Sequence, residues 1–220
     1  MHNSFILFCA LNAVKGMVIT MKMSKEKKKE ILLKNFEILK EDYENNQVSI
    51  AKLVSDMLAI DSTIATDMWV YLLNTYGEYL KGEDSWFLTG SIACKGSDKI
   101  GDVKMDKIIL DNPIVKKAMF ALSCDGIHDQ VGEIIGRRIS ANDLQTADEL
   151  LQMVYNNPYK NSDWYSIMDR VLDGVDVLTE NGYELLEMWC EKADKKTERA
   201  KLSVRMLEFL QDDEDEDDDF

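Results

Sequence analysis

The run Cys124-Asp125-Gly126-Ile127-His128-Asp129 holds the densest set of possible metal ligands in this 220-residue chain. Its side chains offer sulfur, carboxylate and imidazole donors, the groups that bind zinc. However, Asp125 and Gly126 are also ordinary residues for the end of one helix and the start of the next, and no second ligand pair accompanies them. We therefore predict no metal and no cofactor, and keep a metal-dependent hydrolase around His128 as the third of three functional alternatives.

A second possible chemical motif is the glycine pair Gly96 and Gly101, which has the G-x-x-x-x-G spacing of a phosphate-binding loop. That loop requires lysine and a hydroxyl residue next, but Asp102 and Val103 follow. An aspartate at this position would repel phosphate. The pattern therefore predicts a plain loop between helices.

Acidic and nucleophilic residues are abundant but lack the partners that catalysis needs. Glu184, Glu187 and Glu191 recur at helical spacing, which is typical of a solvated helix face. A helical di-metal site would also use Glu-x-x-His, and the chain contains no such motif. A serine or cysteine nucleophile would need a histidine partner, and the chain has only His2 and His128. These absences favour a non-enzymatic protein.

The charge balance indicates which partners are compatible with the chain. It carries a net charge of −15 at pH 7, and residues 212–219 are all carboxylates, which leaves −7 for the rest. A body of that sign is repelled by nucleic-acid phosphates. Another protein, and a basic one in particular, is the more natural partner, although the acidity could equally serve solubility alone. Four widely spaced cysteines without a C-x-x-C pair indicate reduced thiols and a cytoplasmic location.

Apolar residues recur with helical spacing from Ser24 onward, and alternation of period two is nearly absent. Only two prolines interrupt the chain. The sequence thus predicts an all-α fold whose short links make neighbouring helices antiparallel hairpins. These hairpins stack as a short α-solenoid or, alternatively, form a compact bundle. Helix starts are expected at Asn112–Pro113, at Ser140 with Asp143 as a capping box, at Ser162 and at Thr179.

Three regions are expected along the chain. In residues 1–23, the apolar stretch from Phe5 to Val14 is too short to span a bilayer, and its basic residues follow it where a signal peptide would have them first. We interpret this region as an over-extended start or a loosely attached arm. Residues 24–211 form a single all-helical domain. Residues 212–220 form an acidic tail that repels itself and is expected to be disordered.

The stretch 111–122, Asp-Asn-Pro-Ile-Val-Lys-Lys-Ala-Met-Phe-Ala-Leu, resembles the first helix of a HEAT repeat. The likeness rests on proline at the helix start, Val115-Lys116-Lys117-Ala118, and a closing Ala121-Leu122. It covers one helix. The resemblance implies a curved stack of helices whose concave face binds another macromolecule.

Partner-binding residues are expected around the Asn-Asn-Pro loop, on the last two helices and in the tail. Aromatic side chains flank the loop, whereas Trp69, Trp164 and Trp189 fall on apolar stripes and are expected in the core. Basic residues are expected to form a stripe on one side of a helix, which the tail could cover. The candidate residues are Tyr155, Tyr159, Trp164, Tyr165, Lys192, Lys196, Arg199, Asp212, Asp213, Glu214 and Asp215.

Together these patterns predict a non-enzymatic, cytoplasmic, protein-binding helical-repeat module without a membrane span. The main alternative is an acidic inhibitor or immunity-type protein that neutralises a basic nuclease or nucleic-acid-binding protein. Complementary charge would make its association fast and sensitive to salt.

Overall fold

The computed structural model describes residues 23–82, 84–123, 128–159 and 163–211. Within these ranges the chain is helical and contains no strand, which confirms the predicted all-α fold. The helices are α2 (Lys25–Leu39), α3 (Tyr43–Leu58), α4 (Ser62–Tyr76), α5 (Ser85–Leu88), α6 (Gly90–Ile100), α7 (Asp102–Asp111), α8 (Pro113–Lys117), α9 (His128–Ser140), α10 (Leu144–Tyr155), α11 (Trp164–Asp173), α12 (Glu180–Cys190) and α13 (Lys196–Gln211). The short helical turns η1 (Lys40–Asp42), η2 (Gly77–Lys81) and η3 (Ala118–Leu122) continue α2, α4 and α8.

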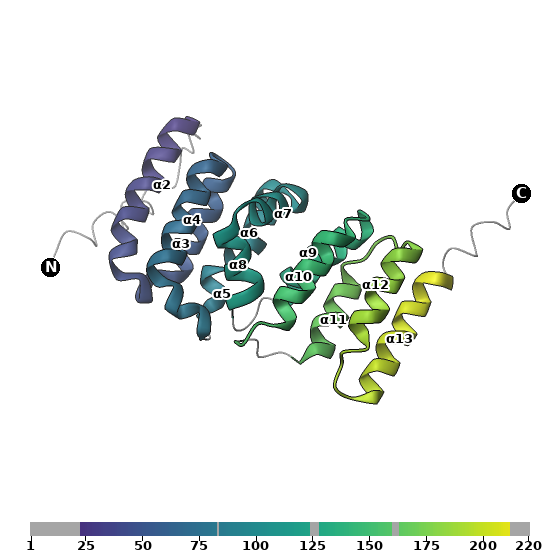
Figure 1. Cartoon of the computed structure of the whole chain (residues 1–220). Coiled ribbons are helices and arrows are strands. Elements are labelled where there is room, and N and C mark those ends of the chain that lie inside the picture. Colours follow the sequence, from purple (N-terminus) through teal and green to yellow (C-terminus); the bar gives the residue numbers. More distant parts are fainter. Residues whose placement is uncertain (1–22, 83, 124–127, 160–162, 212–220) are drawn as a thin grey trace, which may run out of the picture.

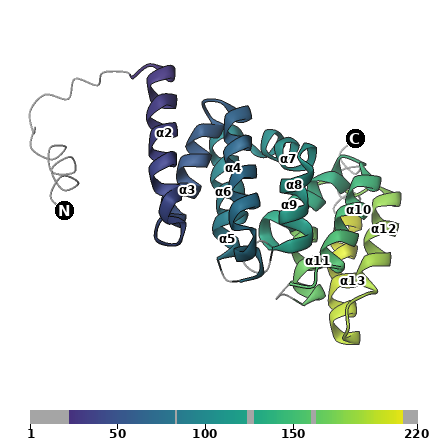
Figure 2. The same cartoon turned by 60° about the vertical axis from the view of Figure 1, so that its left-hand side comes forward.

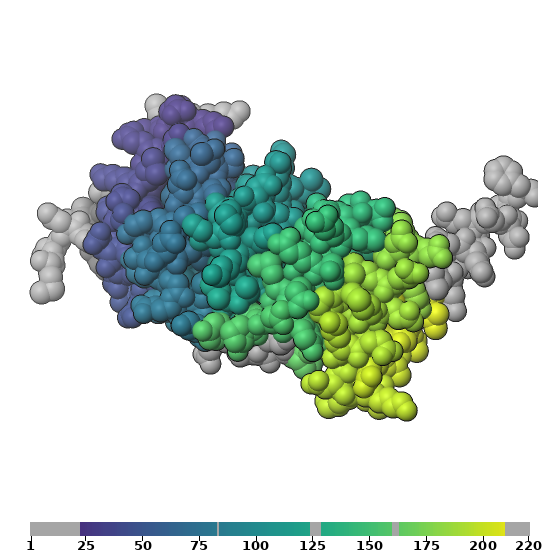
Figure 3. Space-filling model, in the orientation of Figure 1, coloured from purple at the N-terminus to yellow at the C-terminus, as the bar shows by residue number. Residues whose placement is uncertain are grey.

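The helices pack in two layers. One layer is formed by α3, α6, α9, α11 and α13, each packed against the next. The other, which we call the α4–α12 layer, contains α4, α8 with η3, α10 and α12. Helix α2 packs on α3, and α7 lies against α6 and α8. The result is an elongated row with α2 at one end and α13 at the other (Figures 1 and 2), and its surface is continuous between them (Figure 3).

Two of the expected helix starts are confirmed in atomic detail. The Asn112 side chain accepts hydrogen bonds from the backbone N–H groups of Ile114 and Val115, both at 3.1 Å, and Pro113 fills the first turn. The Thr179 hydroxyl accepts a hydrogen bond from the N–H of Gly182 at 3.2 Å. Both caps satisfy backbone donors that have no partner inside the helix.

The other two starts are corrected. Ser140 is the last residue of α9, and its Oγ accepts a hydrogen bond from the backbone N–H of Asp176, beyond α11, at 2.9 Å. The predicted capping box is therefore wrong, because this hydroxyl ties α9 to the α11–α12 link. At α11 the cap is Asp163, whose carboxylate accepts from the N–H of Ser166 at 2.7 Å. Ser162 itself lies outside the described residues.

The predicted loop between Gly96 and Gly101 is also wrong. Gly96 lies within α6, where a Cβ atom would come within 2.6 Å of Met105 Sδ and 2.8 Å of Leu58 Cδ1. Glycine is present there because α6 packs tightly. Only Gly101, with φ of 84°, forms the joint between α6 and α7, in a backbone region that favours glycine.

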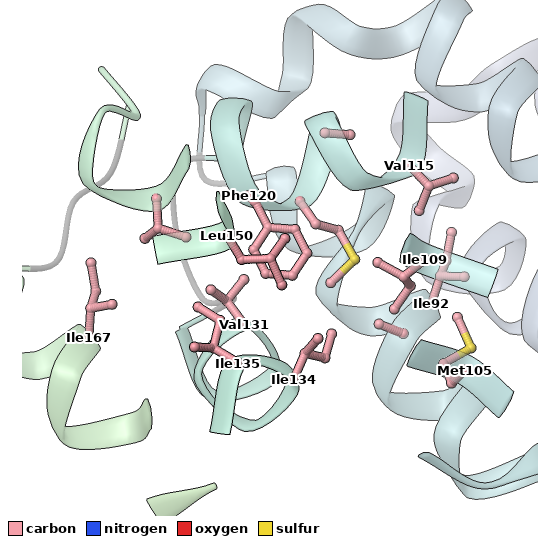
Figure 4. Packing of buried hydrophobic residues seen from close by; sticks show 14 of the residues in the cluster. Ile92, Met105, Ile109, Val115, Phe120, Val131, Ile134, Ile135, Leu150 and Ile167 are labelled. Carbon is pink, nitrogen blue, oxygen red and sulfur yellow. The ribbon is translucent and has the colours of Figure 1, made fainter. Parts of the chain in front are cut away.

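The hydrophobic core runs along the whole row. It is one cluster of buried side chains that extends from Phe36 in α2 to Met206 in α13. At its middle, Phe120, Leu150 and Ile134 bring η3, α10 and α9 together (Figure 4). The three tryptophans expected in the core, Trp69, Trp164 and Trp189, are all at least 95% buried.

A buried ion pair reinforces this middle section. The Asp106 carboxylate on α7 is 2% exposed and accepts two hydrogen bonds from Arg137 on α9, both at 2.8 Å. Arg138 also approaches it, at 3.5 Å. Burial by itself would lower the pKa of Arg137, but its hydrogen bonds to Asp106 more than offset this and raise the pKa overall. The two-pronged geometry fixes α9 against α7.

Candidate interaction surfaces

Two residues of the predicted aromatic patch, Tyr155 and Trp164, lie in one cluster with Trp189. Ring centroids are 5.0 Å apart for Tyr155 and Trp164, 5.8 Å for Tyr155 and Trp189, and 5.6 Å for the two tryptophans. The Trp164 indole N–H donates to the Trp189 carbonyl at 2.8 Å. With 5% exposure, Trp164 joins α11 to α12 from inside, and only Tyr155, 37% exposed, brings this cluster to the surface.

A lysine and a carboxylate complete the cluster at the surface. The Lys192 ammonium lies 3.9 Å from the Trp189 ring centroid and 5.1 Å from that of Tyr155, within the range of a cation–π interaction. The Trp189 indole N–H donates to the Asp148 carboxylate on α10 at 2.8 Å. Sequence reasoning missed the contribution of Asp148, because 41 residues separate it from Trp189 and no local pattern connects them.

The remaining two aromatic candidates pack elsewhere. Tyr159 is half-buried near Lys81 of η2, whose ammonium lies 5.4 Å from the tyrosine ring centroid. Tyr165, also half-buried, faces α13, where the Lys201 ammonium lies 5.7 Å from its ring. Each of these tyrosines thus lies near a lysine from a different element, apart from the Tyr155 cluster.

The predicted basic stripe on one side of a helix is wrong. Helix α12 ends at Cys190 and α13 begins at Lys196, so Lys192 lies in the link between them. Lys196 is exposed and Arg199 is half-buried, both on α13. The turn at Ala193, which is 2% exposed, divides the expected stripe because its side chain packs into the core. The tail candidates Asp212, Asp213, Glu214 and Asp215 lie outside the described residues.

A charged surface emerges instead on α12. Glu180, Glu184 and Glu187 on α12 and Glu191, which caps its end, are all exposed, and their spacing places them on one side of the helix. Met188 lies beside them and is 49% exposed. Across the ranges that the structure describes, none of these four carboxylates forms an ion pair with a basic side chain. We call these five residues the α12 acidic face.

By contrast, acids in the opposite layer are paired across helices. Asp129 of α9 contacts Arg170 of α11 at 2.8 Å, and Arg170 also contacts Asp173 of its own helix at 3.1 Å. Arg205 of α13 bonds to Asp169 and, at 2.7 Å, to Asp173. These residues join neighbouring helices, whereas the α12 acidic face has its charge directed to solvent.

Two open grooves flank α7 on the α4–α12 layer. The groove toward α4 has a volume of 670 Å³ and combines apolar Leu58, Ile60 and Ile108 with Lys104 and Asp67. The groove toward α10 has a volume of 440 Å³ and mixes both signs of charge. Such open, mixed linings are suited to contact with another macromolecule more than to enclosure of a small substrate.

The structure offers no further support for metal chemistry among the residues it describes. Within those ranges, no group of three or more His, Cys, Asp and Glu side chains is arranged to hold a metal ion. Cys124 and Asp125 of the first motif lie outside them. In the same ranges, no helix combines the length and apolar character that crossing a bilayer requires.

Comparison with known proteins gave no relative: neither the family models, nor the curated proteins, nor the solved structures contained a match to this chain.

Proposed function

We propose that this chain is a non-enzymatic helical-repeat module that binds another protein, and that the partner is basic. The observation that carries the proposal is the α12 acidic face. Its four exposed carboxylates surround the exposed Met188, and none of them has a basic partner among the residues that the structure describes. A methionine amid charges supplies apolar contact area that adapts to a partner. Complementary charge steers a basic surface toward it and sets the orientation of binding.

The two-layer order of the helices supports a repeat architecture of the kind that the HEAT resemblance implies. In such stacks, one layer of helices presents an extended surface to a partner. Here the α4–α12 layer would be that surface, with the exposed Tyr155 on α10, which packs against α12. The cytoplasmic location expected from the cysteines stays a prediction.

The test is affinity capture from a lysate of the source cells, with the full chain as bait. Charge reversal of the α12 acidic face, Glu184→Lys with Glu187→Lys, should abolish retention of the basic partner. A matched control, Glu78→Lys with Asp98→Lys, reverses two exposed carboxylates on η2 and α6 and should retain it. Equal retention by both double variants would refute the assignment of the surface.

The tail separates this proposal from the inhibitor alternative. Bait of residues 1–211 removes the eight carboxylates at 212–219. A basic partner that both baits retain, and that the charge-reversed α12 variant loses, is bound by the helical surface. A partner lost with the tail but retained by the charge-reversed α12 variant favours an acidic inhibitor that acts by electrostatic mimicry.

A further inference from the structure

The first helix of the row exposes two isoleucines, flanked by lysines, on the side that faces away from the other described helices. Phe36, 3% exposed, marks the inner side of α2. On the opposite side, Lys27, Ile31, Lys34 and Ile38 recur at spacings of three and four residues. Ile31 is 37% exposed and Ile38 is 60% exposed, at the end of the molecule where α2 lies (Figure 1).

The last helix of the row has the same property. Leu202 and Met206 lie on the inner side of α13 and are 0% and 1% exposed. On the outer side, Ala200 is exposed, Val204 is 59% exposed and Leu207 is 47% exposed. The two ends of one chain therefore each carry a short apolar stripe.

The stripes match in spacing and direction. Ile31 and Ile38 are seven positions apart, as are Ala200 and Leu207, which corresponds to about 10 Å along a helix. Helix α2 begins and α13 ends at the same edge of the row (Figure 1). When two copies in the same orientation are placed end to end, α13 of one copy therefore runs antiparallel to α2 of the next. Leu207 then lies beside Ile31, and Ala200 beside Ile38.

Charge is complementary in this register. At the edge where α2 begins, it carries the exposed Lys25 and Lys28, and the last turn of α13 carries the exposed Glu208. At the other edge, the exposed Glu41 follows α2, whereas α13 begins with the exposed Lys196. Antiparallel helices also place their macrodipoles favourably. A second copy of this chain thus matches both stripes.

We propose that the outer faces of α2 and α13 bind each other between copies of this chain, head to tail. The contact is heterologous, because two different surfaces of the chain meet, and it can repeat along a row of copies. It uses neither the α12 acidic face nor the grooves beside α7, so it goes beyond the proposed function and stands or falls separately. The net charge of −15 opposes association at low ionic strength. Self-association is therefore strongest at moderate salt, which screens this repulsion.

The test is sedimentation velocity of the full chain over a range of concentrations at moderate salt. The wild-type chain should increase in average mass as its concentration rises. Ile38→Lys and Leu207→Lys each place a charge in the proposed contact and should leave the chain monomeric. Val48→Lys is the matched control, because Val48 is 58% exposed on α3, and it should associate like wild type. Circular dichroism checks that all variants are folded.

A mixture of the two variants gives the decisive result. Ile38→Lys keeps an intact α13 face and Leu207→Lys keeps an intact α2 face, so an equimolar mixture should form a dimer that cannot grow further. A wild-type chain that remains monomeric at every concentration overturns the proposal. So does a single variant that associates like wild type, which would indicate α2–α2 or α13–α13 contacts, or a mixture that stays monomeric.

Discussion

Where α9 meets the end of α11, Gly136 lies directly against the backbone of Gly174, and this contact makes a sharp prediction for Gly136→Ala. A Cβ atom at Gly136 would lie 2.3, 2.5 and 2.6 Å from the carbonyl carbon, oxygen and Cα of Gly174. Carbon atoms in ordinary contact are about 3.5–4.0 Å apart. Because all three neighbours are backbone atoms, no side chain can rotate away, and the helices themselves must separate by about 1 Å.

The magnitude follows from two opposed effects. Overpacking a well-packed interior costs about 1–3 kcal/mol, and the backbone origin of this clash places the cost at the upper end, about 3 kcal/mol. Alanine within a helix is favoured over glycine by about 1 kcal/mol. The net expectation is a loss of about 2 kcal/mol in the free energy of unfolding. With a denaturant slope of about 2 kcal/mol/M, the urea midpoint should fall by about 1 M.

The assay is urea unfolding followed by circular dichroism, with Gly77→Ala as the control. Gly77 has φ of −61°, and an added Cβ there would meet no atom within 4 Å. Alanine should therefore stabilise the protein by about 0.4–1 kcal/mol at this position. The two substitutions are chemically identical and should have opposite signs. A Gly136→Ala midpoint equal to or above that of wild type would refute the close-packing argument.

Three further predictions concern buried and paired groups. Asp106→Ala leaves its arginine partners without their buried counter-charge and should lower the free energy of unfolding by about 3 kcal/mol. Lys107 is exposed, so the control Lys107→Ala should change the free energy of unfolding by under about 0.5 kcal/mol in the same urea titration. Burial would raise the pKa of Asp173, but hydrogen bonds from Arg205 and Arg170 lower it overall. The stability that ionised Asp173 contributes is present above its unfolded pKa of about 3.9 and is lost as pH falls through the lower folded pKa. The difference in free energy of unfolding between wild type and Asp173→Asn should therefore become smaller in acid. A difference that stays constant from neutral pH to about pH 3 would contradict this. Burial raises the pKa of the Cys190 thiol to about 12, whereas Cys94 is exposed. After iodoacetamide treatment of the native protein at mildly alkaline pH, peptide mapping should therefore find Cys94 modified and Cys190 intact. Rapid modification of Cys190 would show that α12 opens readily.

Local chemistry in the sequence determined the class of fold and several of its joints. Apolar spacing is a property of short segments, so it predicted the helices without knowledge of their neighbours. The caps at Asn112 and Thr179 were predictable because each side chain bonds within three residues of itself. The same local logic failed at Ser140, whose hydroxyl bonds to Asp176, 36 residues away.

Only the tertiary structure decided which of these segments meet. Asp106 pairs with Arg137 across 31 residues and Asp148 with Trp189 across 41, and neither separation leaves a periodic signal in the sequence. The sequence showed that Glu184, Glu187 and Glu191 share a side of one helix. Packing decided whether neighbouring helices would neutralise these glutamates. In the described structure, Leu186 and Trp189 hold the opposite side of α12 in the core, so the glutamates face solvent. The chain itself determined its helices, and the packing between helices determined which charges remained exposed to solvent.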